Sequence, residues 1–394
     1  MKKKFACLAM AMVMVLSLAA CGGKKEDAPA AAPAESGSDS SVSVFKVGTI
    51  GPLSGDAAIY GQAVANGAKI AVDEINAAGG AIQFELQSQD DEADGEKSVN
   101  AYNTLMDWGM QVMVGPTTTG ASIAVSAQAN ADRTFMLTPS ASSVDVIDGK
   151  DNVFQVCFTD PNQGVASADY ISANMAGAKV AVIYRNDDAY SQGIRDTFVS
   201  EAADKGLEVV YEGTFTADTA TDFSVQLTGA QSAGADTVFL PIYYQPASVI
   251  LNQANAMGYE PTFFGVDGMD GILTMEGFDT SLAEGVMLLT PFSADAEDAR
   301  TQTFVKAYQD QFGETPNQFA ADAYDAVYIY AAALEAAGCT ADMSSADICE
   351  ALVGVMTTIS VDGLTGQGMT WDASGAVSKA PMAVIIENGT YVLP

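Results

Sequence analysis

Strand-like and helix-like segments alternate along most of this chain, and this alternation constrains the fold more than any other feature. Phe45–Gly51 is a short, β-rich run, and Tyr60–Ala78 places small and apolar residues at helical spacing until Gly79-Gly80 ends the pattern. The same order recurs as far as Thr134–Leu137, a strand-like run that ends at Thr138-Pro139. Repeated β-α units of this kind predict a parallel sheet with helices on both of its faces.

A second series of β-α units begins after Pro161 and runs to Gly285–Leu289. Two long helical patterns follow, at Ala296–Phe312 and Gln318–Ala337, and these helices could return to the first unit. Three strand-like segments close the chain, at Met369–Trp371, Met382–Glu387 and Tyr391–Leu393. We therefore predict an α/β protein with two doubly wound units, and the 394 residues agree with about 100–200 residues per domain.

The composition excludes several classes of function. Lys and Arg number 17 against 50 Asp and Glu, and the net charge of −33 excludes a nucleic-acid interface built on clustered basic residues. Histidine is absent, which excludes Ser-His-Asp and Cys-His catalysis and any zinc or haem held by histidine. No catalytic motif stands out. We expect no enzyme activity, no cofactor and no metal, although a lipid-anchored enzyme that works through carboxylates stays an alternative.

The first residues are typical of an exported lipoprotein. Lys2–Lys4 precede the apolar run Phe5–Ala20, which is shorter than the roughly 20 residues of a membrane span, so residues 1–20 are predicted to be a signal peptide. Leu18-Ala19-Ala20-Cys21-Gly22 resembles a bacterial lipobox, in which the chain is cut before a cysteine that then carries a lipid. An uncleaved N-terminal anchor is the alternative.

Residues 21–44 combine the lipidation candidate Cys21 with a segment rich in Ala, Pro, Ser and Gly that is typical of a flexible tether. Because a strongly acidic chain is repelled by anionic lipid, the lipid on Cys21 rather than charge would hold the protein at the membrane. We therefore expect an extracytoplasmic protein that is lipid-anchored to the cell membrane.

Three further cysteines lie in the body of the chain. Cys157 lies in an apolar run and is predicted to be a buried structural thiol. Cys339 and Cys349 flank a polar segment after a long helical pattern. Export permits a disulfide between them, and two free thiols are the alternative.

Ligands of open α/β sheets bind outside the carboxyl ends of the strands. In the first unit these ends carry the segments Gly115–Gly120 and Thr138–Ser142, which are rich in Thr and Ser. In the second unit they carry the segments Arg185–Tyr190, Pro241–Tyr244 and Gly265–Gly268. A ligand site is therefore predicted where these five segments meet.

The residues in these segments suit a free α-amino acid. Thr119 lies just before a predicted helix, where unpaired N–H groups and the helix dipole favour a carboxylate, although Thr also serves as a simple helix cap. Asp267 follows a strand end and could receive an ammonium group, although Asp is also common in turns. Three tyrosines at loop–helix junctions could wall a side-chain pocket or simply pack: Tyr60, Tyr190 and Tyr244.

Several motifs give the chain a family resemblance over about residues 44–394. The N-terminal motifs are Gly51-Pro52-Leu53-Ser54-Gly55, Tyr60-Gly61, Asn66-Gly67-Ala68 and Ile75-Asn76-Ala77-Ala78-Gly79-Gly80. Further motifs are Val114-Gly115-Pro116, Thr138-Pro139-Ser140 and Tyr190-Ser191-Gln192-Gly193. With them the chain resembles the leucine/isoleucine/valine-binding proteins of ABC importers.

The resemblance implies the type I periplasmic binding protein fold, in which two α/β lobes are joined by a hinge of three crossovers and close on the ligand. It implies a first lobe of residues 45–159 plus 291–366 and a second lobe of residues 160–290 plus 367–394. By the same resemblance the protein binds a free amino acid, with Leu, Ile and Val as the leading ligands, and delivers it to ABC permease subunits without making or breaking a bond.

The resemblance also implies roles for individual residues. Thr117, Thr118 and Thr119 would hold the ligand carboxylate, and Asp267 would take the ammonium, although the family more often has Glu at this position. The segment Ser140-Ala141-Ser142 would offer a carbonyl and a hydroxyl to the ligand backbone. Aromatic walls would come from Tyr60, Tyr190 and Tyr244.

We expect a monomer whose partners are the amino acid, the permease and the membrane, with no nucleic acid among them. A ligand-sensing receptor with the same fold is an alternative function. A binder of an amide, urea or an aromatic acid is another, because the family includes such proteins.

Overall fold

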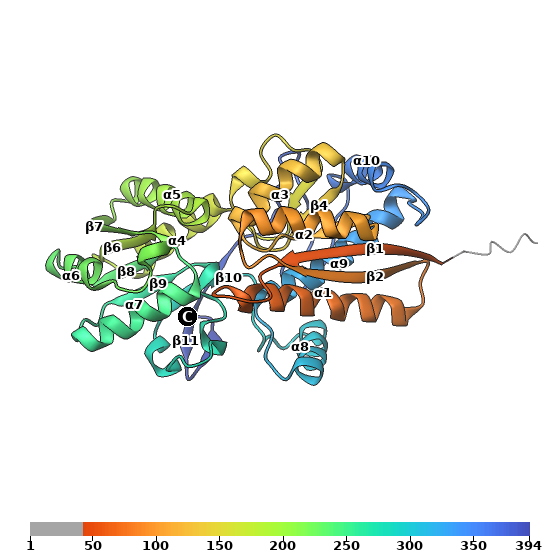
Figure 1. The fold of residues 1–394 in the computed structure, drawn as a ribbon. Coiled ribbons are helices and arrows are strands. Elements are labelled where there is room, and N and C mark those ends of the chain that lie inside the picture. Colours follow the sequence, from red (N-terminus) through yellow and green to blue (C-terminus); the bar gives the residue numbers. More distant parts are fainter. Residues whose placement is uncertain (1–41) are drawn as a thin grey trace, which may run out of the picture. The chain divides into compact units, whose positions relative to one another are not determined.

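The structure, a computed structural model, describes residues 42–394. The predicted signal peptide 1–20, Cys21 and most of the predicted tether 21–44 lie outside the described residues. Within residues 42–394 the strands form two sheets, one of five strands in the order β2-β1-β3-β4-β5 and one of seven in the order β12-β11-β10-β9-β8-β6-β7 (Figure 1). In this part of the chain, no helix has the length and apolar character that crossing a bilayer requires.

The first sheet is parallel throughout. Its strands are β1 (Ser43–Gly51), β2 (Ile82–Asp90), β3 (Val112–Val114), β4 (Phe135–Thr138) and β5 (Val153–Gln155). The helices between them are α1 (Ala58–Ala78), α2 (Gly95–Trp108), α3 (Thr119–Asp132) and the short 3-10 helix η1 (Val144–Val146). The predicted β-α order is therefore confirmed for this sheet.

Alternate residues of each strand face different helices. Val112 and Val114 of β3 pack in the core with α1, whereas Met113 between them packs with α2 and α3. In β4, Phe135 packs in the core with α1, and Met136 packs in the core with α2 and α3. This period of two places α1 on one face of the sheet and α2 and α3 on the other (Figure 1).

The second sheet joins a parallel part to an antiparallel edge. The parallel strands are β6 (Lys179–Arg185), β7 (Glu208–Phe215), β8 (Thr237–Leu240), β9 (Thr262–Gly265) and β10 (Met287–Thr290). The antiparallel strands are β11 (Met382–Glu387) and β12 (Thr390–Val392).

Helices cover both faces of this second sheet as well, with α4 and α5 on one face and α6 and α7 on the other (Figure 1). Their bounds are α4 (Asp160–Asn174), α5 (Ala189–Lys205), α6 (Ser224–Ser232) and α7 (Tyr244–Met257). Short 3-10 helices lie in the loops, at η2 (Ala217–Thr219), η3 (Asp267–Met269), η4 (Ile272–Thr274) and η5 (Thr280–Ala283).

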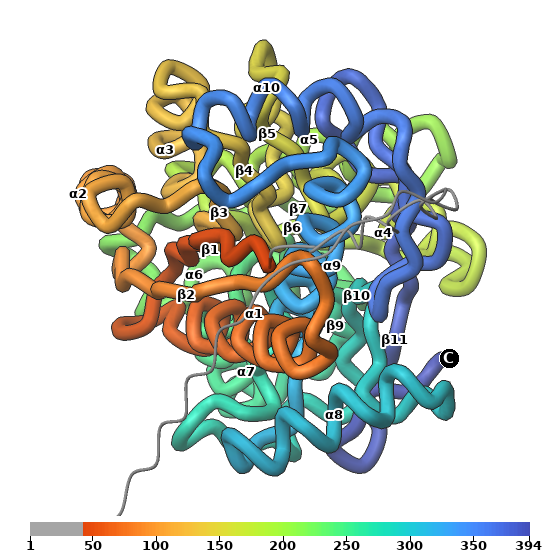
Figure 2. The backbone as a smooth tube through the Cα atoms, turned by 90° about the vertical axis from the view of Figure 1, so that its right-hand side faces the viewer, coloured from red at the N-terminus to blue at the C-terminus, as the bar shows by residue number. Residues whose placement is uncertain are grey.

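Three later helices return to the first sheet: α8 (Ala299–Phe312), α9 (Gln318–Ala337) and α10 (Ser345–Met356). α9 lies along α1 (Figure 2). The hydroxyl of Tyr330 on α9 donates to the carbonyl of Met113 at 2.7 Å. We call the first sheet with α1–α3 and α8–α10 lobe 1, and the second sheet with α4–α7 lobe 2. The chain passes between the lobes after β5, after β10 and before β11, as the predicted three-crossover fold requires.

The segment predicted as a strand at Met369–Trp371 forms only isolated bridges, Val361 with Met369 and Trp371 with Val377. The indole N–H of Trp371 donates to the carbonyl of Gln155 in β5 at 2.8 Å, so this segment contacts lobe 1. The predicted lobe boundary at residue 367 stays a prediction, and these contacts favour a later return to lobe 2.

The three described cysteines, Cys157, Cys339 and Cys349, are free and buried. The prediction of a buried structural thiol at Cys157 is therefore confirmed. The possible disulfide between Cys339 and Cys349 is not formed. Cys349 is fully buried on α10, the helix that packs on β4, whereas Cys339 follows the end of α9.

Candidate ligand-binding site

A small cavity of about 10 Å³ lies between the two lobes, where the carboxyl ends of strands from both sheets meet. Its walls are formed by Tyr60, Thr117, Thr118, Thr119, Ser140, Tyr190, Tyr243, Asp267, Gly268 and Phe319. The structure thus brings together most of the side chains that the sequence pointed to, from segments more than 200 residues apart. This volume holds about one water molecule, so a larger ligand requires the side chains or the lobes to move apart.

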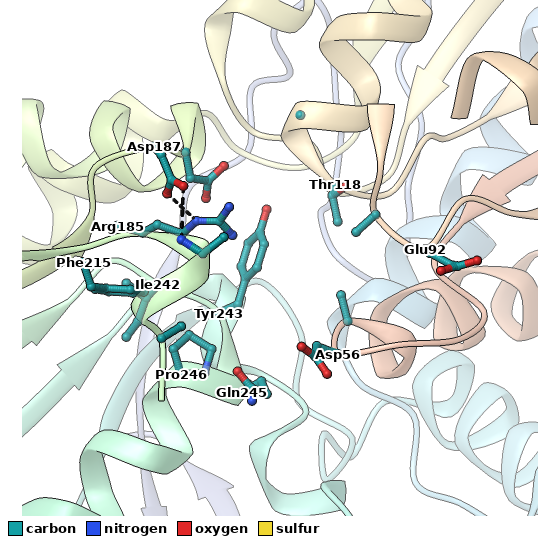
Figure 3. Close-up of a pocket in the computed structure, with 16 residues that line it drawn as sticks. Asp56, Glu92, Thr118, Arg185, Asp187, Phe215, Ile242, Tyr243, Gln245 and Pro246 are labelled. Carbon is teal, nitrogen blue, oxygen red and sulfur yellow. Dashed lines mark hydrogen bonds and ion pairs between the residues drawn. The ribbon is translucent and has the colours of Figure 1, made fainter. Parts of the chain in front are cut away.

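The N-terminus of α3 carries the unpaired donors of lobe 1. Thr118 is the N-cap residue with extended backbone angles, φ −94° and ψ 153°, and its side chain makes no capping hydrogen bond. The hydroxyls of Thr118 and Thr119 are buried and have no hydrogen-bond partner within the described part of the chain. Thr118 faces the space between the lobes (Figure 3). Because the first N–H groups of a helix also lack intrahelical partners, this corner favours an anion.

The loop before α3 is held in place by its other hydroxyls. Thr117 Oγ1 donates to the carbonyl of Ile50 at 3.2 Å, and Ser140 Oγ donates to the carbonyl of Thr117 at 2.6 Å. Thr138 Oγ1 donates to the carbonyl of Pro116 at 2.8 Å. These three hydroxyls donate to backbone carbonyl groups. The donors of the loop that remain without a partner are therefore the hydroxyls of Thr118 and Thr119 and the first N–H groups of α3.

Lobe 2 contributes a buried carboxyl group. Asp267, on η3 just after β9, is only 2% exposed. Burial raises the pKa of Asp267 from its ordinary value of 3.8 to about 6, although a hydrogen bond from Tyr190 opposes the rise. Tyr190 Oη donates to Asp267 Oδ1 at 2.5 Å and accepts from the N–H of Gly268 at 2.9 Å. The carboxyl group is therefore oriented, yet it lacks a positive partner among the residues that line the cavity.

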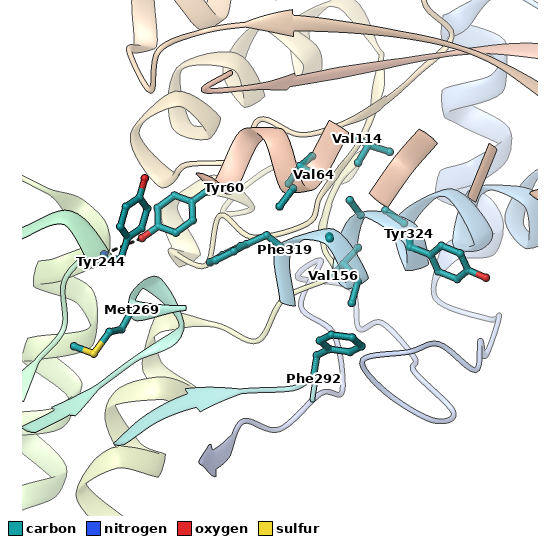
Figure 4. Packing of buried hydrophobic residues seen from close by; sticks show 14 of the residues in the cluster. Tyr60, Val64, Val114, Val156, Tyr244, Met269, Phe292, Phe319 and Tyr324 are labelled. Carbon is teal, nitrogen blue, oxygen red and sulfur yellow. Dashed lines mark hydrogen bonds between the residues drawn. The ribbon is translucent and has the colours of Figure 1, made fainter. Parts of the chain in front are cut away.

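Aromatic rings close the remaining sides. The centroid of the Tyr60 ring in lobe 1 lies 4.5 Å from the ring centroid of Phe319 and 5.4 Å from the ring centroid of Tyr243. Its hydroxyl donates to the carbonyl of Gly268 and accepts from the N–H of Tyr244 at 3.1 Å, both in lobe 2. Tyr60 lies between Tyr244 and Phe319 in a continuous apolar core (Figure 4). The two lobes are thus in direct contact around the cavity.

Three predicted site residues do not line the cavity. Ala141 is fully buried, and its carbonyl accepts from the side chain of Gln155 at 2.8 Å. The Ser142 hydroxyl accepts from the side chain of Gln163 at 3.4 Å. Tyr244 packs on the outer side of Tyr60, with its hydroxyl donating to the carbonyl of Asp56.

Three lining residues were missed by the sequence reasoning: Tyr243, Gly268 and Phe319. Tyr243 is the N-cap residue of α7, so the chain turns there and the ring enters the cavity. The strand-end rule had pointed to this turn and to the one that contains Gly268. Phe319 lies in the first turn of α9, and no sequence signal placed it at the site.

A larger chamber of about 400 Å³ adjoins the cavity and shares Thr118 and Tyr243 with it (Figure 3). Its walls include charged side chains from both lobes: Asp56, Glu92, Arg185, Asp187 and Asp188. The Arg185 guanidinium is already paired with Asp187 at 2.7 Å. Burial raises the pKa of Asp188, and Arg185 opposes the rise.

Comparison with known proteins agrees with this geometry. A family model described as periplasmic binding protein matches residues 44–390. The Leu/Ile/Val-binding protein homolog 3 of Brucella melitensis biotype 1 is 32% identical over 318 residues, which cover 78% of this chain and 82% of that protein.

Two solved structures extend the comparison. The branched-chain amino acid transporter substrate binding protein LivJ from Streptococcus pneumoniae, in complex with isoleucine, is 31% identical with a TM-score of 0.78, and the match covers 89% of this chain and 100% of that one. The leucine binding protein LivK from Thermotoga maritima is 26% identical with a TM-score of 0.79, covering 89% and 97%. The chain therefore belongs to the periplasmic binding protein family, in which it is similar to the Leu/Ile/Val-binding proteins of ABC transporters.

Proposed function

We propose that this protein is the extracytoplasmic solute-binding lipoprotein of an ABC importer, and that it binds a free α-amino acid between its lobes for delivery to the permease. One observation carries the proposal. The buried carboxyl group of Asp267 and the unpaired donors around Thr119 at the N-terminus of α3 line the same small cavity. A negative group opposite an anion-binding helix end matches the two charged ends of an amino acid.

In the proposed complex the carboxylate of the ligand accepts from the first N–H groups of α3 and from the Thr119 hydroxyl. The ammonium pairs with the carboxyl group of Asp267, which Tyr190 orients by donating to Oδ1. Removing both pairs from water strengthens them, since hydrogen bonds between charged groups are about twice as strong as neutral ones. The rings of Tyr60, Tyr190 and Phe319 exclude solvent.

Binding would hold the lobes together and so mark the loaded protein for the permease. Tyr60 supports this proposal because it already joins the lobes through Gly268 and Tyr244. The ligand adds a second bridge, between α3 of lobe 1 and Asp267 of lobe 2. No covalent step is involved.

The lipid anchor on Cys21, the tether 21–44, the monomeric state and the permease remain part of the proposal. They are supported by the lipobox-like sequence and by the names of the relatives. Those names also make branched-chain amino acids the first ligands to test.

A thermal-shift and calorimetry panel tests the proposal. The purified protein is mixed with all twenty amino acids, amides, urea and aromatic acids. For leucine, two analogues each lack one charged end: 4-methylpentanoate has no ammonium and 3-methylbutylamine has no carboxylate. A ligand at 100 times its Kd should add about 2.7 kcal/mol to the stability.

We expect stabilisation by one or more α-amino acids and none by analogues that lack either charged end of the same ligand. Stabilisation by an amide, urea or an aromatic acid alone would contradict the proposal. So would equal binding of an amino acid and its analogue without the ammonium.

A further inference from the structure

A buried ion pair lies where the third crossover leaves lobe 1. Lys379 Nζ donates to Asp322 Oδ1 at 2.6 Å, and both side chains are 2% exposed. Lys379 Nζ also donates to Thr365 Oγ1 at 2.5 Å, and this hydroxyl donates to Asp325 Oδ2 at 2.6 Å. Both aspartates lie on α9. Because hydrogen bonds are directional, this network holds the end of the Lys379 side chain at one place on that helix.

The chain is fixed to lobe 1 at Lys379 and to lobe 2 shortly after it. Met382 begins β11 and pairs with Thr290 in the second sheet. Only Ala380 and Pro381 lie between these two anchors, and the proline ring fixes its own φ angle. Rotation of the lobes at this crossover is therefore confined to a few backbone bonds directly beside the ion pair.

The pair also lies beside the first crossover and close to the ligand site. Burial raises the pKa of the Cys157 thiol well above its ordinary value, and Asp322 adds to the rise whereas Lys379 opposes it. Gln318, one turn before Asp322 on α9, donates from Nε2 to the carbonyl of Asp267 at 3.2 Å. At 1.5 Å per residue, about 6 Å of helix separates the pair from this contact with the turn that carries Asp267.

These two contacts of α9 respond differently to lobe movement. The cavity holds about one water molecule, so the lobes must separate to admit an amino acid. The bond from Gln318 joins α9 of lobe 1 to lobe 2, and separation breaks it. The Lys379–Asp322 pair joins α9 to a segment that already contacts lobe 1 through Trp371, so it need not break. It is therefore placed to be a fixed point of the movement.

We propose that the Lys379–Asp322 pair is a positioning pair for ligand binding: it fixes the third crossover to α9 as the pivot of lobe closure, and so raises ligand affinity without touching the ligand. This inference rests on the proposed function, because it requires an amino acid that holds the two lobes together. With the pivot in place, closure returns Gln318 to the carbonyl of Asp267. Without it, α9 and the crossover can shift against each other, and the closed state loses this contact.

A double substitution separates positioning from a purely structural role. Lys379→Met or Asp322→Asn alone leaves one buried charge without its partner, which lowers the stability. Lys379→Met combined with Asp322→Leu replaces the pair by apolar side chains of comparable size, a change that is often neutral for stability. The double variant nevertheless lacks the directional bonds between α9 and the crossover. It therefore tests affinity in a protein whose stability is restored.

Two further variants complete the set. Thr365→Val is the milder change, because it keeps the ion pair and removes only the hydroxyl that links Lys379 to Asp325. Lys306→Met on α8 is the matched control, because Lys306 forms an exposed pair with Asp310 at the same 2.6 Å. Urea unfolding gives the stability of each variant. Calorimetry and stopped-flow mixing with leucine give the Kd and the two rates, and the other nineteen amino acids replace leucine if it does not bind.

We expect the double variant to unfold near the urea midpoint of the wild type and to bind at least about fivefold more weakly, the loss of roughly one hydrogen bond between the lobes. The loss should appear in the dissociation rate, because the open protein still admits the ligand. Thr365→Val should weaken binding about threefold, and Lys306→Met should match the wild type.

Wild-type affinity in the folded double variant would overturn the inference, since the pair would then be structural only. If that variant does not fold, wild-type affinity in Thr365→Val would overturn it. A loss confined to the association rate would overturn it as well. These three results leave the proposed function intact, whereas a folded wild type that binds no amino acid would refute the proposed function together with the inference.

Discussion

Replacing Asp267 by asparagine tests the proposed ammonium site with little change of shape. The side chain is 2% exposed, and asparagine can still accept the hydrogen bond that Tyr190 donates at 2.5 Å. The substitution removes the negative charge that the ligand ammonium would meet. Losing one partner of a buried charge pair costs about 2–5 kcal/mol, and 1.4 kcal/mol is a factor of ten. We therefore expect amino-acid binding at pH 7 to weaken roughly 30-fold or more.

The same substitution should stabilise the ligand-free protein. Burial raises the pKa of Asp267 from 3.8 to about 6, so the folded protein holds this proton more tightly than the unfolded chain does. The resulting loss of stability is absent below pH 3.8, grows as the pH rises and is complete above about pH 6. At 1.36 kcal/mol per pKa unit it amounts to about 3 kcal/mol at pH 7. Because asparagine carries no charge, the unfolding free energy should rise by up to about that amount.

Two assays separate these effects. Calorimetry gives the affinity for the best amino acid, and urea unfolding without ligand gives the stability. Asp270→Asn is the matched control, because Asp270 is also 2% exposed and lies in the same turn but does not line the cavity. Affinity within about threefold of the wild type in folded Asp267→Asn would refute the ammonium site. A lower stability of that variant without ligand would refute the argument from the buried charge.

Three further predictions follow from the same contacts. Lowering the pH from 7.5 to 5 should weaken amino-acid binding about tenfold, because Asp267 must lose its proton before it pairs with the ammonium. Binding at pH 5 should therefore release about one proton per ligand. Calorimetry in two buffers of different ionisation enthalpy measures the Kd and the proton release, and a Kd that does not change with pH would contradict the prediction. Tyr60→Phe removes the hydrogen bond to Gly268 and should weaken binding roughly fivefold while the ligand-free protein expands in small-angle scattering; unchanged values would show that this bond does not hold the lobes together. Gly67→Ala would push a methyl group into the carbonyl of Ala320 where α1 meets α9, so the urea unfolding free energy should fall by about 1–3 kcal/mol, and an unchanged value would contradict this close contact.

The architecture was predictable because it follows from periodicity. Parallel strands with helices on both faces show up as short apolar runs between helical patterns, and these survive errors of a few residues at each boundary. The strand β5 and the helix α10 escaped this reasoning. β5 spans only Val153–Gln155, too short for a period to show, and α10 begins in the stretch between Cys339 and Cys349, which was interpreted only as a polar segment.

The site was predictable where the strand-end rule sufficed. It led to Thr117–Thr119, Ser140 and Asp267, which line the cavity. It could not decide between neighbours, because it assigned Tyr244 to the site, whereas Tyr244 begins α7 and the residue before it, Tyr243, lines the cavity.

Other failures have the same origin, since the direction of a side chain in a turn depends on contacts that sequence alone does not reveal. Ser142 turns towards Gln163 rather than into the cavity. Phe319 enters the site from a helix whose relation to the strand ends depends on how α9 returns to lobe 1. The spacing of Cys339 and Cys349 likewise carried no information about whether the two thiols would bond, and both are free and buried.

The crystal structure of the complex with the tightest-binding amino acid tests the central claim most directly. We predict that the ligand nitrogen lies within about 2.7–3.2 Å of a carboxyl oxygen of Asp267, and that the ligand carboxylate accepts from the first N–H groups of α3 and from Thr119 Oγ1. A ligand bound with its two ends reversed, or held away from Asp267 and α3, would contradict the account.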